Sequence, residues 1–147
     1  MYKNIFIIAI ITVFFISCNG NGQNTISKND ALALMDEFFE KTKENNFDLV
    51  EMYYSESIYQ QTPKEEWEEM YTKIHNLLGT LVSVELQSWN MKSHIGTSGS
   101  GRYFTFVYTN NYENGIATET INLFVPKGTK DIKIIGHNYN SNVFLKL

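Results

Sequence analysis

The sequence of 147 residues has a single cysteine, Cys18, so the chain cannot form an internal disulfide bond. Cationic residues are also few: the net charge is −4, and Arg102 is the only arginine. Proteins that bind nucleic acid use runs of lysine and arginine to neutralise phosphates, and the sequence contains no such run. We therefore expect no nucleic-acid partner.

Signatures of common catalytic and metal-binding sites are also missing. There is no glycine-rich phosphate loop after a strand, no G-x-S-x-G motif and no calcium-loop spacing. The three histidines, His75, His94 and His137, do not have the spacing of a zinc site. We expect neither a metal ion nor a cofactor, and nucleophilic catalysis has no candidate residue with a visible partner.

The longest apolar run lies at the N-terminus and is short. Residues 5–16 are apolar apart from Thr12, with Lys3 before them and Ser17 after them. Twelve helical residues span about 18 Å, whereas the core of a bilayer is about 30 Å thick. This layout is typical of a cleaved signal peptide, which would comprise residues 1–17.

The end of this segment resembles the bacterial lipoprotein signal, in which a small residue precedes a cysteine that becomes the diacylated mature N-terminus. Ser17 and Cys18 match that pattern, whereas Phe15 departs from the leucine usually found there. The resemblance implies a stable membrane anchor on Cys18, because each buried CH₂ group contributes about 0.8 kcal/mol. Residues 18–27, rich in glycine and asparagine, would then be a flexible tether. The expected location is the cell envelope, on the outer membrane facing the periplasm.

Residues 28–147 are expected to form one folded domain, since 43% of the residues are apolar and 14% are aromatic. The domain should begin with helices. Asp30 is placed to cap a helix that runs to about Asn45 with a broad apolar face. A short helical piece is expected at residues 47–54.

A second long helix has a clear start signal. Thr62 is expected to be its N-cap, with Pro63 at the first helical position and Glu65 completing a capping box. Gly79 is placed to end the helix in a left-handed conformation. His75 falls outside the apolar stripe of this helix and is therefore expected at the surface.

The sequence after Thr80 alternates between apolar and polar residues, which predicts strands. Val82, Val84 and Leu86 should share one face of the first strand. The expected strands are residues 81–91, 102–112, 116–125 and 132–142. Helices followed by strands indicate an α+β fold, with the N-terminal helices packed on a four-stranded antiparallel sheet.

The dipeptide at positions 114–115, Asn-Gly, predicts a tight hairpin turn between the second and third strands. Pairing through this turn sets Tyr108 opposite Ile121 and Glu119 opposite Asn110. These side chains share a face with other apolar residues, so we expect that face to be the core.

Several features together resemble small bacterial lipoproteins of unknown function with the nuclear-transport-factor-2-like, or cystatin-like, fold. They are Phe38-Phe39, residues 48–50 and 53–55, Trp67, Leu78-Gly79, Glu119 and Ile134-Ile135-Gly136. The similarity extends over roughly residues 30–141. It implies a curved, cone-like sheet, a cystatin-like half barrel whose mouth often holds a ligand. A fold of this kind does not by itself define a function.

Glu119 stands out because a carboxylate lies on an otherwise apolar face. Glu119 could be a structural residue, either at the rim or hydrogen-bonded, or it could contact a ligand. If it is buried with a raised pKa, it is a candidate general base. Enzymes resembling ketosteroid isomerase use a pocket carboxylate beside tyrosines in this kind of fold. Tyr53, Tyr54 and Tyr108 are available as partners.

The abundance of aromatic residues favours a concave site for an apolar ligand or a protein partner. The residues expected to line it are Tyr53, Trp89, Phe106, Tyr108 and Glu119. His137 has the parity of a residue that either lines the interior or faces solvent.

Three hypotheses follow. The first is a non-enzymatic envelope lipoprotein whose domain binds a small apolar ligand or a protein partner. The second is a ketosteroid-isomerase-like enzyme with Glu119 as the pocket base. The third is a purely structural or inhibitory interaction protein.

Overall fold

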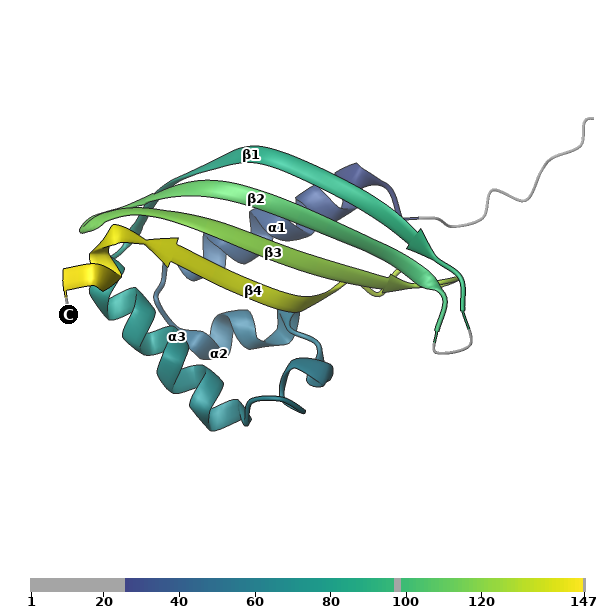
Figure 1. The fold of residues 1–147 in the computed structure, drawn as a ribbon, viewed down its shortest axis with the longest axis horizontal. Helices are drawn as coiled ribbons and strands as arrows, with labels where there is room; N and C mark the ends of the chain where they lie inside the picture. The colour runs from purple at the N-terminus through teal and green to yellow at the C-terminus, as the bar shows by residue number, and fades with distance from the viewer. Residues whose placement is uncertain (1–25, 97–98, 147) are drawn as a thin grey trace, which may run out of the picture.

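The computed structural model describes residues 26–96 and 99–146. The predictions about the signal peptide, Cys18 and most of the tether concern residues 1–25 and lie outside the described residues. The fold is α+β, with three α-helices packed against a four-stranded antiparallel sheet that is not closed into a barrel (Figure 1). The strand order is β1-β2-β3-β4, so each strand pairs with its neighbour in sequence.

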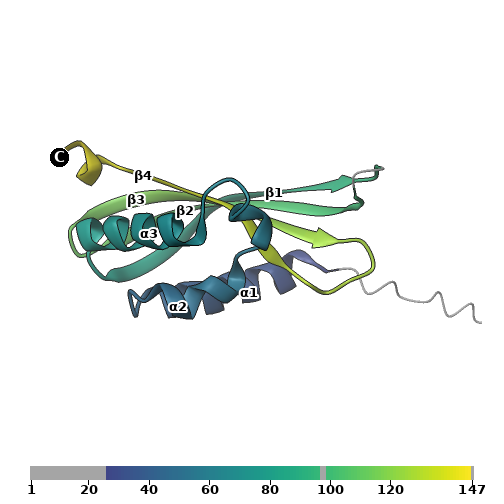
Figure 2. The same ribbon diagram turned by 90° about the horizontal axis from the view of Figure 1, so that it is seen from below.

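The helical elements precede the strands, as expected. They are α1 (Lys28–Thr42), α2 (Phe47–Val50), the 3-10 helices η1 (Glu51–Tyr53) and η2 (Glu56–Ile58), and α3 (Lys64–Leu78). The strands are β1 (Leu81–His94), β2 (Gly101–Tyr112), β3 (Gly115–Pro126) and β4 (Lys133–Ser141), followed by the 3-10 helix η3 (Asn142–Lys146). Helix α1 crosses behind the sheet, and α3 runs beside β4 (Figures 1 and 2). No helix in the described residues is long and apolar enough to cross a membrane.

Both long helices begin at a different residue from the one predicted. In α1 the N-cap is Ser27, whose hydroxyl accepts from the Asp30 amide at 3.3 Å while the Asp30 carboxylate accepts from the Ser27 amide at 2.7 Å. The prediction that Asp30 is the cap was wrong, because this aspartate completes a capping box from inside the helix. In α3 the N-cap is Pro63, with an extended ψ of 148° and no side-chain cap. Thr62 therefore stands one residue too early to cap the helix.

The β2–β3 hairpin has a register two residues away from the predicted one. Its turn is Glu113-Asn114, so Tyr108 lies opposite Glu119 rather than Ile121. Hydrogen bonds to the end of α3 hold this turn: the Glu113 carboxylate accepts from the Thr80 amide at 2.9 Å, and the Asn114 amide donates to Leu78 O at 2.8 Å. A shift of two residues keeps every side chain on its predicted face.

Bulges in the two edge strands change which side chains face the helices. A register shift between Leu81 and Ser83 leaves Val82 64% exposed, so the prediction that it shares a face with Val84 and Leu86 was wrong. In β4 a shift opposite Asn122 and Leu123 puts both Ile134 and His137 on the inner side. An extra residue in one strand reverses the parity beyond it.

The core lies between the helices and the inner face of the sheet. Fully buried apolar side chains come from α1, α2, α3, β2, β3 and β4. They include Ala31, Met35, Phe38, Val50, Leu78, Phe104, Phe106, Ile121, Leu123 and Ile134. Glu119, Asn110 and His75 are as buried as these residues, at 0%, 0% and 1% exposure. Buried polar groups require partners, so these three residues define where the site begins.

A buried polar network behind an apolar groove

Glu119 is the centre of a hydrogen-bonded network in the core. Its Oε1 accepts from Asn110 Nδ2 at 2.8 Å and from the Tyr112 hydroxyl, and its Oε2 accepts from His137 Nε2 at 2.9 Å. Glu119, Asn110 and Tyr112 come from β2 and β3, and His137 comes from β4. Three adjacent strands with inward-facing polar residues therefore assemble the network.

The pKa of Glu119 is held below its ordinary value, contrary to the expectation for a buried carboxyl. Burial alone raises this pKa, but the hydrogen bond and charge interaction with His137, followed by the bonds from Tyr112 and Asn110, outweigh it. A carboxylate that is ionised and accepts three hydrogen bonds is a stable structural anion. This lowered pKa differs from the raised pKa expected for a desolvated general base.

His137 links the carboxylate to a tyrosine from the helical layer. Its Nδ1 shares a hydrogen bond of 2.8 Å with the hydroxyl of Tyr54, which lies between η1 and η2. Burial, followed by the charges of Tyr71 and Glu119, raises the pKa of Tyr54 well above its ordinary value. The Glu119–His137–Tyr54 relay therefore ends in a neutral hydroxyl.

His75 extends the network from α3 and is not a surface residue, as the sequence had suggested. Its Nε2 is 3.2 Å from the Tyr139 hydroxyl, and its ring lies 4.1 Å from that of Tyr71, centroid to centroid. Burial is the main cause that lowers the pKa of His75 to about 4; the Glu119 charge opposes this shift and the His137 charge adds to it. The buried face of α3 therefore includes His75 as well as the apolar residues from which that face was predicted.

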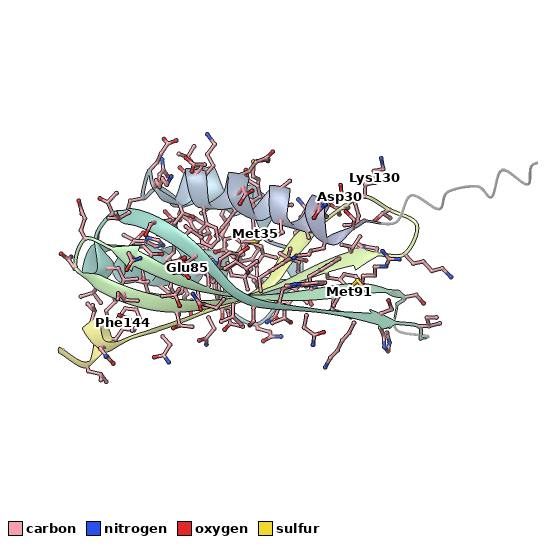
Figure 3. All side chains as sticks on the ribbon, turned by 90° about the horizontal axis from the view of Figure 1, so that it is seen from above. Asp30, Met35, Glu85, Met91, Lys130 and Phe144 are labelled. Carbon is pink, nitrogen blue, oxygen red and sulfur yellow. The ribbon has the colours of Figure 1, made fainter. Side chains whose placement is uncertain are left out.

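A groove with a volume of about 350 Å³ opens between α3 and β4, with this network behind its wall. Its apolar lining comes chiefly from α3 and η3, and its aromatic lining comes from both sides. The lining residues are Tyr54, Trp67, Met70, Tyr71, Lys73, Ile74, Leu77, His137, Asn138, Tyr139 and Phe144. Phe144 marks the end of the molecule at which the groove lies (Figure 3).

Two polar atoms from the lining residues are buried without hydrogen-bond partners: Trp67 Nε1 and the Tyr71 hydroxyl. The indole lowers the pKa of Tyr54 and Thr42 lowers that of Tyr71, so both pairs lie close together. Neither contact has hydrogen-bond geometry, however, and Thr42 already donates to Phe38 O at 2.9 Å. Both groups can donate a hydrogen bond, and leaving a buried donor unpaired costs about 1–3 kcal/mol.

The five residues predicted to bind a ligand occupy several places, and none of them lines the groove. Phe106 is in the core; Tyr53 and Tyr108 are nearly as buried. Trp89 is 44% exposed on β1, with the Lys28 ammonium 4.5 Å above its ring. Glu119 is in the network, where it forms no hydrogen bond with the predicted tyrosine partners; Tyr108 lies opposite it on β2, and Tyr54 is linked to it through His137.

Sequence reasoning did not identify the α3 side of the site. Trp67 was used only as a feature of the family resemblance, Tyr71 was not singled out, and His75 was excluded from the interior. A usable signal was present, however: Tyr71 and His75 are four residues apart and therefore lie on the same face of the helix. Among the described residues, no group of three or more His, Cys, Asp or Glu side chains is placed to hold a metal ion.

Comparison with known proteins finds no matching family model, no matching curated sequence and no matching solved structure.

Proposed function

We propose that this protein is a non-enzymatic, lipid-anchored envelope protein that binds a small apolar ligand in the groove between α3 and β4. The observation that carries the proposal is the groove lining, in which apolar and aromatic side chains surround a few polar ones, Lys73 and Asn138 among them. Ligand sites typically combine apolar walls with a few polar groups that orient the ligand. The ligand is then a small, mostly apolar molecule.

The energetic argument for such a ligand rests on the apolar walls. Met70, Ile74 and Phe144 supply apolar contact area at about 25 cal/mol per Å² buried. Trp67 Nε1 and the Tyr71 hydroxyl are buried below the groove surface, so they are not contact points for the ligand. The contact energy therefore favours a mostly apolar molecule.

The architecture is consistent with the resemblance that the sequence suggested. We propose that the open sheet with helices packed against it is a cone-like variant of the nuclear-transport-factor-2-like, cystatin-like fold. The order of elements, helices and then four meandering strands, supports this proposal. The lipoprotein-like segment that ends at Cys18 supports a bacterial envelope location, proposed here as the outer membrane facing the periplasm.

Acid–base catalysis of the ketosteroid-isomerase kind receives less support from the site. The Glu119 carboxylate accepts from Asn110, Tyr112 and His137 and is fully buried behind them. A general base must come within about 2.6–3.2 Å of the proton it removes, or act through one water. Here the network places His137 and Tyr54 between the carboxylate and the groove, so we favour binding over catalysis.

The test is binding of the apolar fluorophore N-phenyl-1-naphthylamine to the purified protein. Met70, a groove residue that is 41% exposed, is replaced by glutamate. The matched control is Met52→Glu, because Met52 is 69% exposed and does not line the groove. We expect Met70→Glu to weaken binding at least about tenfold, equivalent to about 1.4 kcal/mol, and Met52→Glu to leave it within about twofold.

Equal affinity in both variants would place the fluorophore elsewhere and contradict the groove assignment. Absence of fluorophore binding to the wild-type protein would favour the third hypothesis, a structural or inhibitory protein with a macromolecular partner. Circular dichroism of each variant checks that the fold is intact.

A further inference from the structure

Cationic side chains gather at the end of the domain where the described chain begins. Ile26 and the start of α1, the β1–β2 hairpin and the β3–β4 connection meet at this end. We call it the tether-end surface and define it by Lys28, Lys92, Arg102, Lys127 and Lys130. The only acidic residues in the described parts of ranges 26–30, 92–102 and 126–131 are Asp30 and Asp131. Five cations against two carboxylates oppose the net charge of −4 of the whole chain.

The other 14 of the 16 acidic residues lie outside these ranges, so the charge is unevenly distributed over the molecule. Glu65, Glu66, Glu68 and Glu69 are all on the first turns of α3. Figure 3 shows Lys130 and Met91 toward the end where the chain enters, and Phe144 at the opposite end. A charged surface would therefore attract one end of this domain and repel another.

Exposed apolar and aromatic side chains accompany the cations. Ile95 is 84% exposed, Trp89 44%, Met91 42% and Tyr103 38%. All four belong to β1, β2 or their connection. Tryptophan and tyrosine are enriched where proteins meet the headgroup layer of a bilayer, and lysine and arginine are attracted to anionic headgroups. A cavity of about 370 Å³, lined by Ile26, Ile95, Arg102 and Lys127 among others, opens in the same surface.

The chain that precedes Ile26 limits how far this surface can lie from a membrane. Seven residues lie between Cys18 and Ile26, so eight residue steps join them. Eight steps span at most about 29 Å when fully extended. The Debye length at physiological salt is about 8 Å. The anchor therefore keeps the tether-end surface within about 29 Å of the membrane and lets its cations reach the shorter range in which an anionic surface attracts them.

We propose that the tether-end surface docks on the anionic phospholipid bilayer in which Cys18 is anchored, with Lys92, Lys127 and Lys130 at the headgroups and Trp89 and Ile95 at the interface. This inference rests on the lipid anchor of the proposed function. Docking directs the groove end of the domain, where Phe144 lies, away from the membrane.

The first experiment measures partitioning of the mature chain, residues 18–147 with Cys18→Ser, onto phosphatidylglycerol-containing vesicles and onto vesicles of phosphatidylcholine alone. We expect binding only to the anionic vesicles, reversed by salt. Lys127→Glu with Lys130→Glu should lower the partition coefficient at least about 25-fold, since each cation near an anionic surface contributes roughly fivefold. The control is Lys41→Glu with Lys43→Glu, which changes the net charge equally on exposed residues of α1 and its C-cap. It should change partitioning by less than about threefold.

Equal loss in both double variants would show dependence on net charge alone and overturn the proposal. So would equal binding to both kinds of vesicle, or binding to soluble polyanions but not to vesicles.

The second experiment uses the acylated protein in vesicles. Its lipid anchor keeps the domain at the membrane, so a weak affinity of the domain itself for lipid does not prevent the measurement. Brominated phosphatidylglycerol should quench Trp89 in a Trp67→Phe variant more strongly than it quenches Trp67 in a Trp89→Phe variant. Equal quenching, or stronger quenching of Trp67, would overturn the docking orientation. Failure of the protein to stay with the vesicles would instead overturn the lipid anchor, so the two proposals fail in different ways.

Discussion

Acidification from pH 7.5 to pH 4.5 should destabilise this protein through one buried histidine. His75 is 1% exposed and is packed among Tyr71, Tyr112 and Tyr139. Its pKa falls from 6.5 to about 4 on folding, mainly because burial disfavours the charged imidazolium. The unfolded chain therefore binds a proton on this residue at a pH where the folded chain does not.

The sign and the size follow from proton linkage. Where the unfolded state binds more protons, the free energy of unfolding rises with pH, so stability is complete above about pH 6.5 and is lost as pH falls toward 4. Between pH 7.5 and pH 4.5 the loss from His75 is about 2–3 kcal/mol for a pKa change from 6.5 to about 4. The free energy of unfolding of a domain is typically about 5–15 kcal/mol, so a loss of this size would be measurable.

Urea denaturation of the wild type and of His75→Gln, followed by circular dichroism across this pH range, measures the effect. Glutamine does not titrate, and its amide can still bond to the Tyr139 hydroxyl. Glu119, Asp30 and Glu113 also have lowered pKa values and destabilise the fold in acid, but they are present in both proteins and largely cancel in the difference. The wild type should therefore lose about 2–3 kcal/mol more than the variant.

Parallel curves for the two proteins would refute the reasoning. They would mean that His75 takes up its proton without cost in the folded state, and that the aromatic cluster around it opens to water. A wild type that becomes more stable than the variant on acidification would reverse the sign and exclude a neutral buried imidazole.

Two further predictions concern the network and the end of α3. Glu119→Gln should lower the free energy of unfolding by about 3–5 kcal/mol in urea denaturation, because it breaks a buried pair with His137; a loss below about 1 kcal/mol would mean that the pair contributes no net stability. Gly79→Ala should cost about 2 kcal/mol more than Gly128→Ala in the same assay. Both glycines have a φ near 80°, but a Cβ at position 79 would lie 2.9 Å from Glu113 Cβ and one at position 128 meets nothing within 4 Å. Equal losses would show that the backbone conformation alone is responsible.

Much of the fold could be predicted because its signals are local. Helical periodicity, strand alternation and the Asn-Gly dipeptide at 114–115 depend on residues close in sequence, and the element order that they indicate is confirmed. The errors at the helix starts are also local. Ser27 and Asp30 form one capping box. Taking Asp30 rather than Ser27 as the N-cap placed the predicted start of α1 three residues too late.

The parts that could not be predicted depend on contacts between distant segments. The hairpin register is set by bonds from Glu113 and Asn114 to the end of α3, which no pattern within the hairpin reveals. Its error of two residues left the core face correct. The bulge in β4 could not be predicted either. It matters for the site because it turns His137 inward, on the same side as Ile134.

The network itself was within reach of a comparison between strands. Glu119 on β3 shares its inward parity with Asn110 and Tyr112 on β2, and a charged residue is seldom buried without such partners. Polar residues at core parity on adjacent strands therefore indicate one another, whereas Glu119 considered alone left a structural carboxylate, a ligand contact and a catalytic base as alternatives. An isolated buried carboxyl is expected to have a raised pKa. The pKa of Glu119 is lowered instead, because each neighbouring donor stabilises the anion. The chemistry of a buried acid is thus set by what the adjacent strands place beside it.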